Sequence, residues 1–244
     1  MFLINPFIYG APISFSNLKS WSGDGVDEYV SLGRVNMLEA TSNFSVSCWI
    51  KVDDYTAARR IFGRYKTGTS QTFANIQTTG KIFFGVSNGA SSYVASSTVL
   101  TTGLWYHVCF VWDAALTNAD RQRIYIDGVL ETTVQTGTAP SSTDSFQQTC
   151  YIGENNAVSP KPFNGNIDEF AIFDYALTSG EVTALYNSGC PNDLMSLAEA
   201  KRPEHYYRFE NVTFPTVPDL GQTGTNNGTM TNQESGDITT DTPC

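Results

Sequence analysis

Two adjacent carboxylates, Asp168 and Glu169, lie in the segment FNGNIDEFAIF of residues 163–173 and could serve acid–base chemistry. Glycoside hydrolysis needs two carboxyl groups at a defined separation in one cleft. Neighbouring side chains on a strand point to opposite faces, so this pair does not meet that requirement. His107 and His205 have no serine or cysteine beside them in a recognisable nucleophile motif. The sequence therefore predicts a protein that is not an enzyme, in which both histidines are structural.

Aromatic side chains indicate a second chemistry, the binding of sugars. Sugar sites combine an aromatic platform with a few polar groups on a concave surface. Trp49 lies on the row of its predicted strand that carries serine and lysine, and Tyr65, Tyr93 and Trp21 lie near predicted loops. We predict Trp49, Tyr65 and Tyr93 as the carbohydrate-binding candidates. The core of a β-sandwich also needs aromatic residues, and the sequence does not separate the two roles.

The charge of the chain argues against nucleic acid as a partner. It has 14 Lys and Arg against 24 Asp and Glu, a formal net charge of −10. Phosphate-binding surfaces need clustered cations, and the one basic cluster comprises Arg59, Arg60, Arg64 and Lys66. We interpret this cluster as a solvated hairpin, with an interface to an acidic partner as the alternative.

The apolar N-terminus does not fit a membrane span or an export signal. No apolar run approaches the roughly 20 residues needed to cross a bilayer. The segment MFLINPFIYG lacks a basic region, and Pro6 interrupts it. We therefore interpret residues 1–13 as an arm of the mature protein rather than a signal peptide.

The five cysteines do not form a pattern typical of metal binding. They are widely spaced, with no C-x-x-C motif and no His/Cys cluster that would suggest zinc or iron. Cys48 and Cys109 each lie inside a predicted strand. We therefore expect these two to be buried free thiols.

The elements that must position these residues are short strands separated by Gly, Asn, Ser and Thr. Residues 44–52 and 82–86 alternate with the two-residue period of a strand. Residues 104–113 are apolar on both rows, as in a central strand covered on both faces. Asp127 and Gly128, between two apolar runs, predict a tight hairpin. Many short strands with almost no helix predict an all-β fold, a two-sheet antiparallel sandwich.

The segment of residues 163–186 predicts a strand, a turn and one short helix in that order. Residues 167–174 alternate with apolar side chains on both faces, as a buried strand does. Thr178 and Glu181 fit a capping box at the start of the helix. Gly189 follows the helix as a stop signal.

Residues 191–244 predict a C-terminal extension with a helix, a strand and a tail rich in Gly, Asn and Thr. The sequence favours a short helix over Asp193–Arg202, capped by Asp193 and stopped by Pro203. HYYRFEN, residues 205–211, is an aromatic run with high β-propensity. Such a strand could extend the same sandwich or pair with a neighbouring subunit, and both alternatives stay open.

Five segments resemble, in the correct order, parts of laminin-G-like domains in the concanavalin A-like lectin and glucanase superfamily. They are WSGDGVDEYV at 21–30, residues 44–52, LWYHVCFVWD at 104–113, residues 124–130 and residues 163–186. The resemblance covers roughly residues 14–190. It implies that this stretch is one concanavalin A-like jelly-roll domain, preceded by the arm of residues 1–13 and followed by the extension of residues 191–244.

The resemblance also implies ligands. Many relatives are similar in holding one structural calcium between the opening and closing strands, and the matching positions here are Asp24, Asp27 and Asp168. Hard cations need several oxygen ligands, whereas the first two aspartates also fit a turn flanked by glycine. Carbohydrate binding is the commonest non-catalytic role in the family. The carboxylate triplet by which its glucanases resemble one another is missing from this sequence.

The C-terminal segment, with NNGTMTN and a final DITTDTPC, looks like the tails of laminin-G-like proteins common in marine phages. This similarity implies a structural protein of a tailed bacteriophage particle, with capsid or other virion proteins as partners, in a homo-oligomer, and with host glycans as a ligand. The alternative is a carbohydrate-binding module that is secreted or held at a bacterial surface. A glycoside hydrolase is the third and weakest hypothesis, because the carboxylate triplet is missing.

Overall fold

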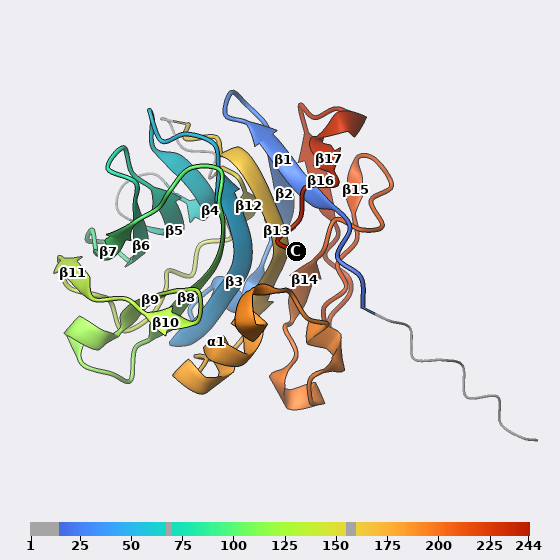
Figure 1. Cartoon of the computed structure of the whole chain (residues 1–244). Helices are drawn as coiled ribbons and strands as arrows, with labels where there is room; N and C mark the ends of the chain where they lie inside the picture. The colour runs from blue at the N-terminus through green and yellow to red at the C-terminus, as the bar shows by residue number, and fades with distance from the viewer. Residues whose placement is uncertain (1–14, 67–69, 155–159) are drawn as a thin grey trace, which may run out of the picture.

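The computed structural model describes residues 15–66, 70–154 and 160–244, which form two antiparallel β-sheets packed face to face (Figure 1). Sheet A has the strand order β10-β9-β8-β3-β13-β1-β17, and β14 also pairs with β13. Sheet B has the order β11-β7-β6-β5-β4-β12-β2-β16-β15. The predicted two-sheet antiparallel sandwich is confirmed.

The strands of sheet A are β1 (Ser20–Asp24), β3 (Asn43–Val52), β8 (Trp105–Asp113), β9 (Gln122–Ile126), β10 (Val129–Leu130), β13 (Asn164–Phe173), β14 (His205–Tyr207) and β17 (Ile238–Thr239). The strands of sheet B are β2 (Tyr29–Arg34), β4 (Arg59–Tyr65), β5 (Gln71–Ile76), β6 (Lys81–Ser87), β7 (Tyr93–Val99), β11 (Thr133–Thr136), β12 (Thr149–Ile152), β15 (Thr216–Val217) and β16 (Gly228–Thr231). Short 3₁₀ turns are η1 (Asn36–Leu38), η2 (Asn118–Asp120), η3 (Asn187–Gly189), η4 (Leu194–Ser196), η5 (Glu199–Lys201) and η6 (Ser235–Asp237). The helix α1 spans Ser179–Tyr186, and no helix in the described ranges is long and apolar enough to cross a bilayer.

The main hydrophobic core lies between the two sheets. Alternate residues of each strand point into it, among them Phe44 and Ile50 of β3 and Phe84 of β6, all without exposed surface. Burial of each large apolar side chain contributes about 1.5–3 kcal/mol, so this core drives the packing of the sheets. Cys48 and Cys109 are buried free thiols, as predicted.

A second, smaller core covers the outer face of sheet A. Figure 1 shows α1 and the segment that follows it side by side, and Leu185 and Leu194 from these two elements share one buried cluster with Val111 of β8. The predicted capping box is present, since the Glu181 N–H donates to Thr178 Oγ1 and the Thr178 N–H donates to Glu181 Oε2. The helix and its extension thus leave the outer face of sheet B as the uncovered side of the sandwich.

The structure divides the predicted opening strand, residues 21–30, into two strands of different sheets. The chain leaves β1 of sheet A through a turn and enters β2 of sheet B. Gly25 has a φ of 78°, and Asp24 Oδ1 accepts a hydrogen bond of 2.7 Å from the Val26 N–H. These are properties of a tight turn, in which glycine reaches positive φ without a steric penalty. The predicted hairpin at Asp127 is confirmed between β9 and β10.

The helix predicted over Asp193–Arg202 is wrong, because the structure has two separate 3₁₀ turns there, η4 and η5. Asp193 does cap the first, since its carboxylate accepts from the Met195 N–H at 3.0 Å. Leu197 and Ala198 then return to extended backbone, which separates the two turns. Packing of Leu194 into the second core decides the path here, as tertiary contacts often override helix propensity.

The strand predicted at residues 205–211 belongs to the chain's own sandwich. His205–Tyr207 pairs with Phe170–Ile172 of β13, and further along the extension β16 pairs with β2 and β17 with β1. Of the two alternatives for this strand, pairing within the same sandwich is the one observed. The extension contributes to both sheets, and the predicted arm of residues 1–13 lies outside the described residues.

Candidate functional site

The outer face of sheet B carries a row of aromatic rings that crosses five neighbouring strands. The register places these residues directly opposite one another: Tyr93 on β7, Gly85 on β6, Phe73 on β5, Gly63 on β4 and Tyr151 on β12. Directly opposed residues share one face of a sheet, so the rings alternate with glycines along the row. Strands lie about 4.8 Å apart, which places a ring roughly every 10 Å across the sheet.

Gly85 provides the space in which the Phe73 ring lies against the sheet. A Cβ atom at Gly85 would lie 2.3 Å from Phe73 Cε1, far inside the normal carbon–carbon contact of about 3.5–4.0 Å. The guanidinium of Arg60 on β4 lies over the same ring, 4.7 Å from its centroid, in a cation–π contact. Phe73, only 8 % exposed, is therefore the support on which Arg60 is positioned.

A groove of about 430 Å³ lies over strands β4 to β7. Its lining includes Arg60, Gln71, Asn75, Phe83, Tyr93 and Lys161. Phe83 and Tyr93 are half-buried and stack on each other, with ring centroids 5.1 Å apart and an interplanar angle of 19°. Flat apolar rings beside hydrogen-bonding groups suit a ligand that has one apolar face and a polar rim.

Hydrogen-bond donors in this groove lack acceptors. Arg60 Nη1 makes one long contact of 3.4 Å with Asn75 Oδ1, while Arg60 Nε and Asn75 Nδ2 have no hydrogen-bond partner in the described part of the chain. Burial lowers the pKa of Arg60 to about 10, and the nearby charge of Glu154 opposes this shift. The guanidinium therefore stays charged at neutral pH.

A second hollow of about 180 Å³ continues the row of rings beyond β4. Tyr29 and Tyr151 line it and meet edge to face, with centroids 5.3 Å apart. Asp27 and Asn232 line the same hollow, and the Asn232 side-chain amide donates to Asp27 Oδ2 at 3.0 Å. Because Tyr151 also belongs to the row that contains Tyr93, the two hollows lie along one line across sheet B.

The structure separates the sequence-predicted sugar-binding residues. Tyr93 lines the groove, and Tyr65 lies on the same face opposite Gln71 but does not line it. The structure corrects the expectation that Trp49 or Trp21 could bind a sugar, because their side chains are buried, at 4 % and 0 % exposed. Trp21 belongs to the main core, and Trp49 stacks with Tyr186 of α1 at 6.0 Å, so neither ring can present a face to a sugar.

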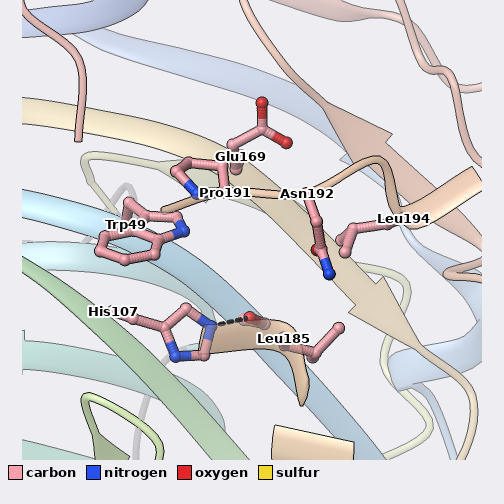
Figure 2. A pocket seen from close by; sticks show the side chains of 8 residues that line it. Trp49, His107, Glu169, Leu185, Pro191, Asn192 and Leu194 are labelled. Atoms are coloured by element: carbon pink, nitrogen blue, oxygen red, sulfur yellow. Dashed lines mark hydrogen bonds between the residues drawn. The ribbon is translucent and has the colours of Figure 1, made fainter. Parts of the chain in front are cut away.

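A small void beside Trp49, on the outer face of sheet A, is too small for a sugar. Figure 2 shows Trp49, His107, Glu169 and Pro191 around it. Its volume is about 10 Å³, close to the space that one water molecule needs. His107 Nε2 and the Ser47 hydroxyl share a hydrogen bond of 2.8 Å, and burial lowers the pKa of His107 to about 3. A neutral, buried imidazole agrees with the predicted structural role.

Asp168 and Glu169 do not point to opposite faces, which corrects the expectation from their adjacency. Glu169 has a φ of 51° and lies in a β-bulge between the pairings of Asp168 with Trp49 and of Ala171 with Ser47. A bulge adds one residue to a strand, so two successive side chains can share a face.

Both carboxyl groups are buried under the extension. They are 0 % and 4 % exposed, and burial raises the pKa of Asp168 and raises that of Glu169 to about 7. Tyr206 and Arg208 hydrogen bond to Glu169. A pair that substrate cannot reach does not supply the two carboxylates of a glycosidase.

The three aspartates predicted to bind calcium do not come together. Asp24 and Asp27 flank the turn after β1, whereas Asn164 of β13 is the residue opposite Asp24. Asp168 lies four residues further along β13, about 13 Å at the usual strand rise. In the described ranges, no group of three or more His, Cys, Asp or Glu side chains is arranged to hold a metal ion. These residues do not fit a single calcium site.

The basic cluster predicted as a solvated hairpin is mostly buried instead. Arg59, Arg60 and Arg64 are 8 %, 4 % and 1 % exposed. Arg59 pairs with Asp54 at 2.7 Å, and Arg64 with Asp144 at 2.8 Å. Ion pairs therefore compensate the charges of Arg59 and Arg64, whereas Arg60 has no ion pair among the described residues and lines the groove.

Sequence reasoning missed Arg60, Asn75 and Phe83 as site residues. A usable signal was present in the alternation of β6, since Ile82, Phe84 and Val86 form its core row. The opposite row, which includes Phe83, must then face away from the core.

Comparison with known proteins places the chain by fold. A model of the concanavalin A-like lectin/glucanases superfamily matches residues 24–183. A candidate carbohydrate-binding protein from Bacteroides ovatus is 20 % identical with a TM-score of 0.63, over 93 % of this chain and 60 % of that one. This chain thus spans less than two thirds of the length of that protein.

Two smaller structures are also similar. The CBM40 domain of the Ruminococcus gnavus IT-sialidase, solved with α2,3-sialyllactose, is 14 % identical with a TM-score of 0.53 over 70 % of this chain and 100 % of the domain. The heptameric SAP-like pentraxin of Limulus polyphemus is 18 % identical with a TM-score of 0.50, over 70 % and 82 % of the two chains. No curated protein matched. At these identities the likeness concerns the fold alone.

Proposed function

Because this chain belongs to the concanavalin A-like lectin/glucanases superfamily, we propose that it is a carbohydrate-binding protein that holds its ligand on the outer face of sheet B. The observation that carries the proposal is the groove over β4–β7, where the Phe83–Tyr93 stack lies beside unsatisfied donors. Pyranose rings have apolar C–H faces and hydroxyl rims, which match an aromatic platform with polar groups around it.

The second hollow supports a ligand longer than one sugar. Tyr93 and Tyr151 belong to one row and lie four strands apart, about 19 Å at the usual strand spacing. An oligosaccharide lying across the strands would contact both hollows. The CBM40 domain, which has the same fold, was solved with a bound sialyllactose, and the Bacteroides protein is a candidate carbohydrate-binding protein; both agree with this proposal.

Binding without cleavage is part of the proposal. In the described chain, none of the residues that line the groove over β4–β7 is acidic, whereas glycosidases use two carboxyl groups at the scissile bond. Prolonged incubation with any oligosaccharide that binds should therefore release no shorter product by mass spectrometry. Release that depends on the folded protein would overturn this part.

A glycan array with the whole chain and its Tyr93→Ala variant tests the proposed site. Loss of a stacking platform costs about 1 kcal/mol or more, so Tyr93→Ala should weaken binding at least about fivefold. Tyr65→Ala is the matched control, because Tyr65 lies on the same face outside the groove, and its binding should stay within about twofold. Equal losses in both variants, or no bound glycan for the parent chain, would contradict the assignment.

We also propose, from the resemblance of the C-terminal segment alone, that the protein is a structural component of a tailed-phage particle that presents sheet B outward. A secreted or cell-surface module is the alternative. The extension of residues 191–244 is built into both sheets, so attachment would fall to the arm of residues 1–13. Removing residues 1–12 should release the protein from purified particles and leave its fold unchanged. The virion role would be opposed if the truncated protein stayed attached to the particles, or if the full-length protein were not found in them. Light scattering would give the oligomeric state.

A further inference from the structure

Within the described ranges, Arg60 differs from several other buried or half-buried arginines in having no carboxylate within ion-pair distance. Among the described residues, Arg59, Arg64 and Arg208 each form an ion pair with an aspartate or glutamate. Arg60 forms none within 4.0 Å, although it is only 4 % exposed in a chain of net charge −10. A buried charge that is not paired is costly to fold around, so such a position calls for a compensating anion.

The groups around this guanidinium orient it but do not neutralise it completely. Phe73 supports it from the sheet, and Asn75, 1 % exposed, offers its carbonyl oxygen and keeps its own amide donor unused. The charge of Glu154 acts on Arg60, and Glu154 Oε2 accepts a hydrogen bond of 2.8 Å from the Lys161 N–H. Lys161 adds a second cation to the groove lining, whereas Glu154 lines the neighbouring hollow.

The platform and the cations lie in the same groove. Phe83, opposite Asn75 in the register, belongs to the stacked pair, and Tyr93 lies on the next strand. A sugar ring on this pair would bring a substituent toward Arg60 and Asn75. Arginine binds planar anions through parallel N–H donors, and charge-assisted hydrogen bonds of this kind are about twice as strong as neutral ones.

We infer that the groove selects an acidic saccharide, whose carboxylate or sulfate group accepts hydrogen bonds from Arg60 and Asn75 while its ring stacks on Phe83 and Tyr93. This inference rests on the proposed carbohydrate-binding function and adds the chemical class of the ligand. The anion supplies the ion-pair partner that the described residues do not place within 4.0 Å of Arg60.

Matched glycans test this inference. Lactose, 3′-sialyllactose and 3′-sulfolactose share one neutral core and carry no charge, a carboxylate or a sulfate, and the glycan array adds other neutral and acidic pairs. Acidic members should bind at least about tenfold more tightly than their neutral counterparts, as expected for one charge-assisted contact. The preference should shrink between 50 and 500 mM NaCl, and the sialyl and sulfo arms identify which anion is taken.

Variants separate this inference from the parent proposal. Arg60→Gln should remove the preference for acidic glycans, and Lys161→Gln should reduce it without a change in the buried part of the groove. Lys81→Gln is the control for general charge, because Lys81 begins β6, one of the strands under the groove, but does not line the groove. Neutral glycans bound as well as acidic ones would overturn the inference and leave the binding function standing. If the chain binds no glycan of either kind, both the binding function and the inference are wrong. An equal loss of the preference for acidic glycans in Lys81→Gln and Lys161→Gln would also overturn the assigned site.

Discussion

Replacement of Gly85 by alanine should damage the groove through the Phe73 ring. The added Cβ would lie 2.3 Å from Cε1 and 2.6 Å from Cζ of that ring, so the ring must move by about 1 Å or more to restore normal contact. Overpacking of this kind costs about 1–3 kcal/mol. For a chain of this size each kcal/mol lowers the melting temperature by about 2–4 °C, which gives an expected fall of about 2–12 °C.

The same displacement should weaken glycan binding, because Arg60 rests on the Phe73 ring. Calorimetric melting and glycan titration of Gly85→Ala measure the two effects separately. Gly180→Ala is the control, since no atom beyond its chain neighbours and the backbone of α1 lies within 4 Å of the added Cβ, and its melting temperature should stay the same or rise. The loss in Gly85→Ala should become smaller when Phe73→Leu is combined with it. An unchanged melting temperature for Gly85→Ala would refute the account of how the groove is built.

Three further predictions concern other parts of the chain. Burial raises the pKa of Glu28 from its usual 4.5 to about 7, so the folded state holds a proton that the unfolded state releases, and stability should fall as pH rises from about 4.5 to about 7; Glu28→Gln should flatten this fall in thermal melts at pH 5 and 8. Deletion of residues 203–244 should unfold the sandwich rather than only release the protein from a particle or oligomer, because β14 is buried in sheet A. A cooperative melt of the truncated chain would contradict this. Calcium binding stays a prediction from resemblance, and any rise of the melting temperature in millimolar calcium should vanish in Asp24→Asn and survive Asp168→Asn, because these two side chains lie on different parts of the fold.

Local patterns predicted the fold well because each depended on only a few neighbouring residues. The capping box at Thr178 and the hairpin at Asp127 are sequence-local structures, and both are present. The two-residue period of β3 likewise identified its core row. The predictions that were wrong needed information from outside the segment. Adjacent positions 168 and 169 share a face only because a bulge interrupts the pairing of β13 with β3.

The candidate site was predicted less completely, because its residues come from four strands whose register the sequence does not specify. Tyr93 was recognised by its residue type and its place near a loop, and it does line the groove. Arg60 was interpreted as one member of a basic cluster. Its difference from Arg59 and Arg64 depends on which cations find an aspartate in the folded chain, 5 residues away for Asp54 and 80 for Asp144.

The choice between the two outer faces of the sandwich explains why Trp49 and Tyr93 have different environments. Both lie on strands with an outward row of polar and aromatic residues, so composition alone does not distinguish them. Leu185 of α1 and Leu194 of the extension pack on the outer face of sheet A. They lie around the same small void as Trp49, which also stacks on Tyr186 and is buried. Sheet B receives no such cover over β4–β7 in the described chain, so its row of rings stays accessible. The helix that identified the fold in the sequence therefore also decides which face can bind a ligand, by covering the other one.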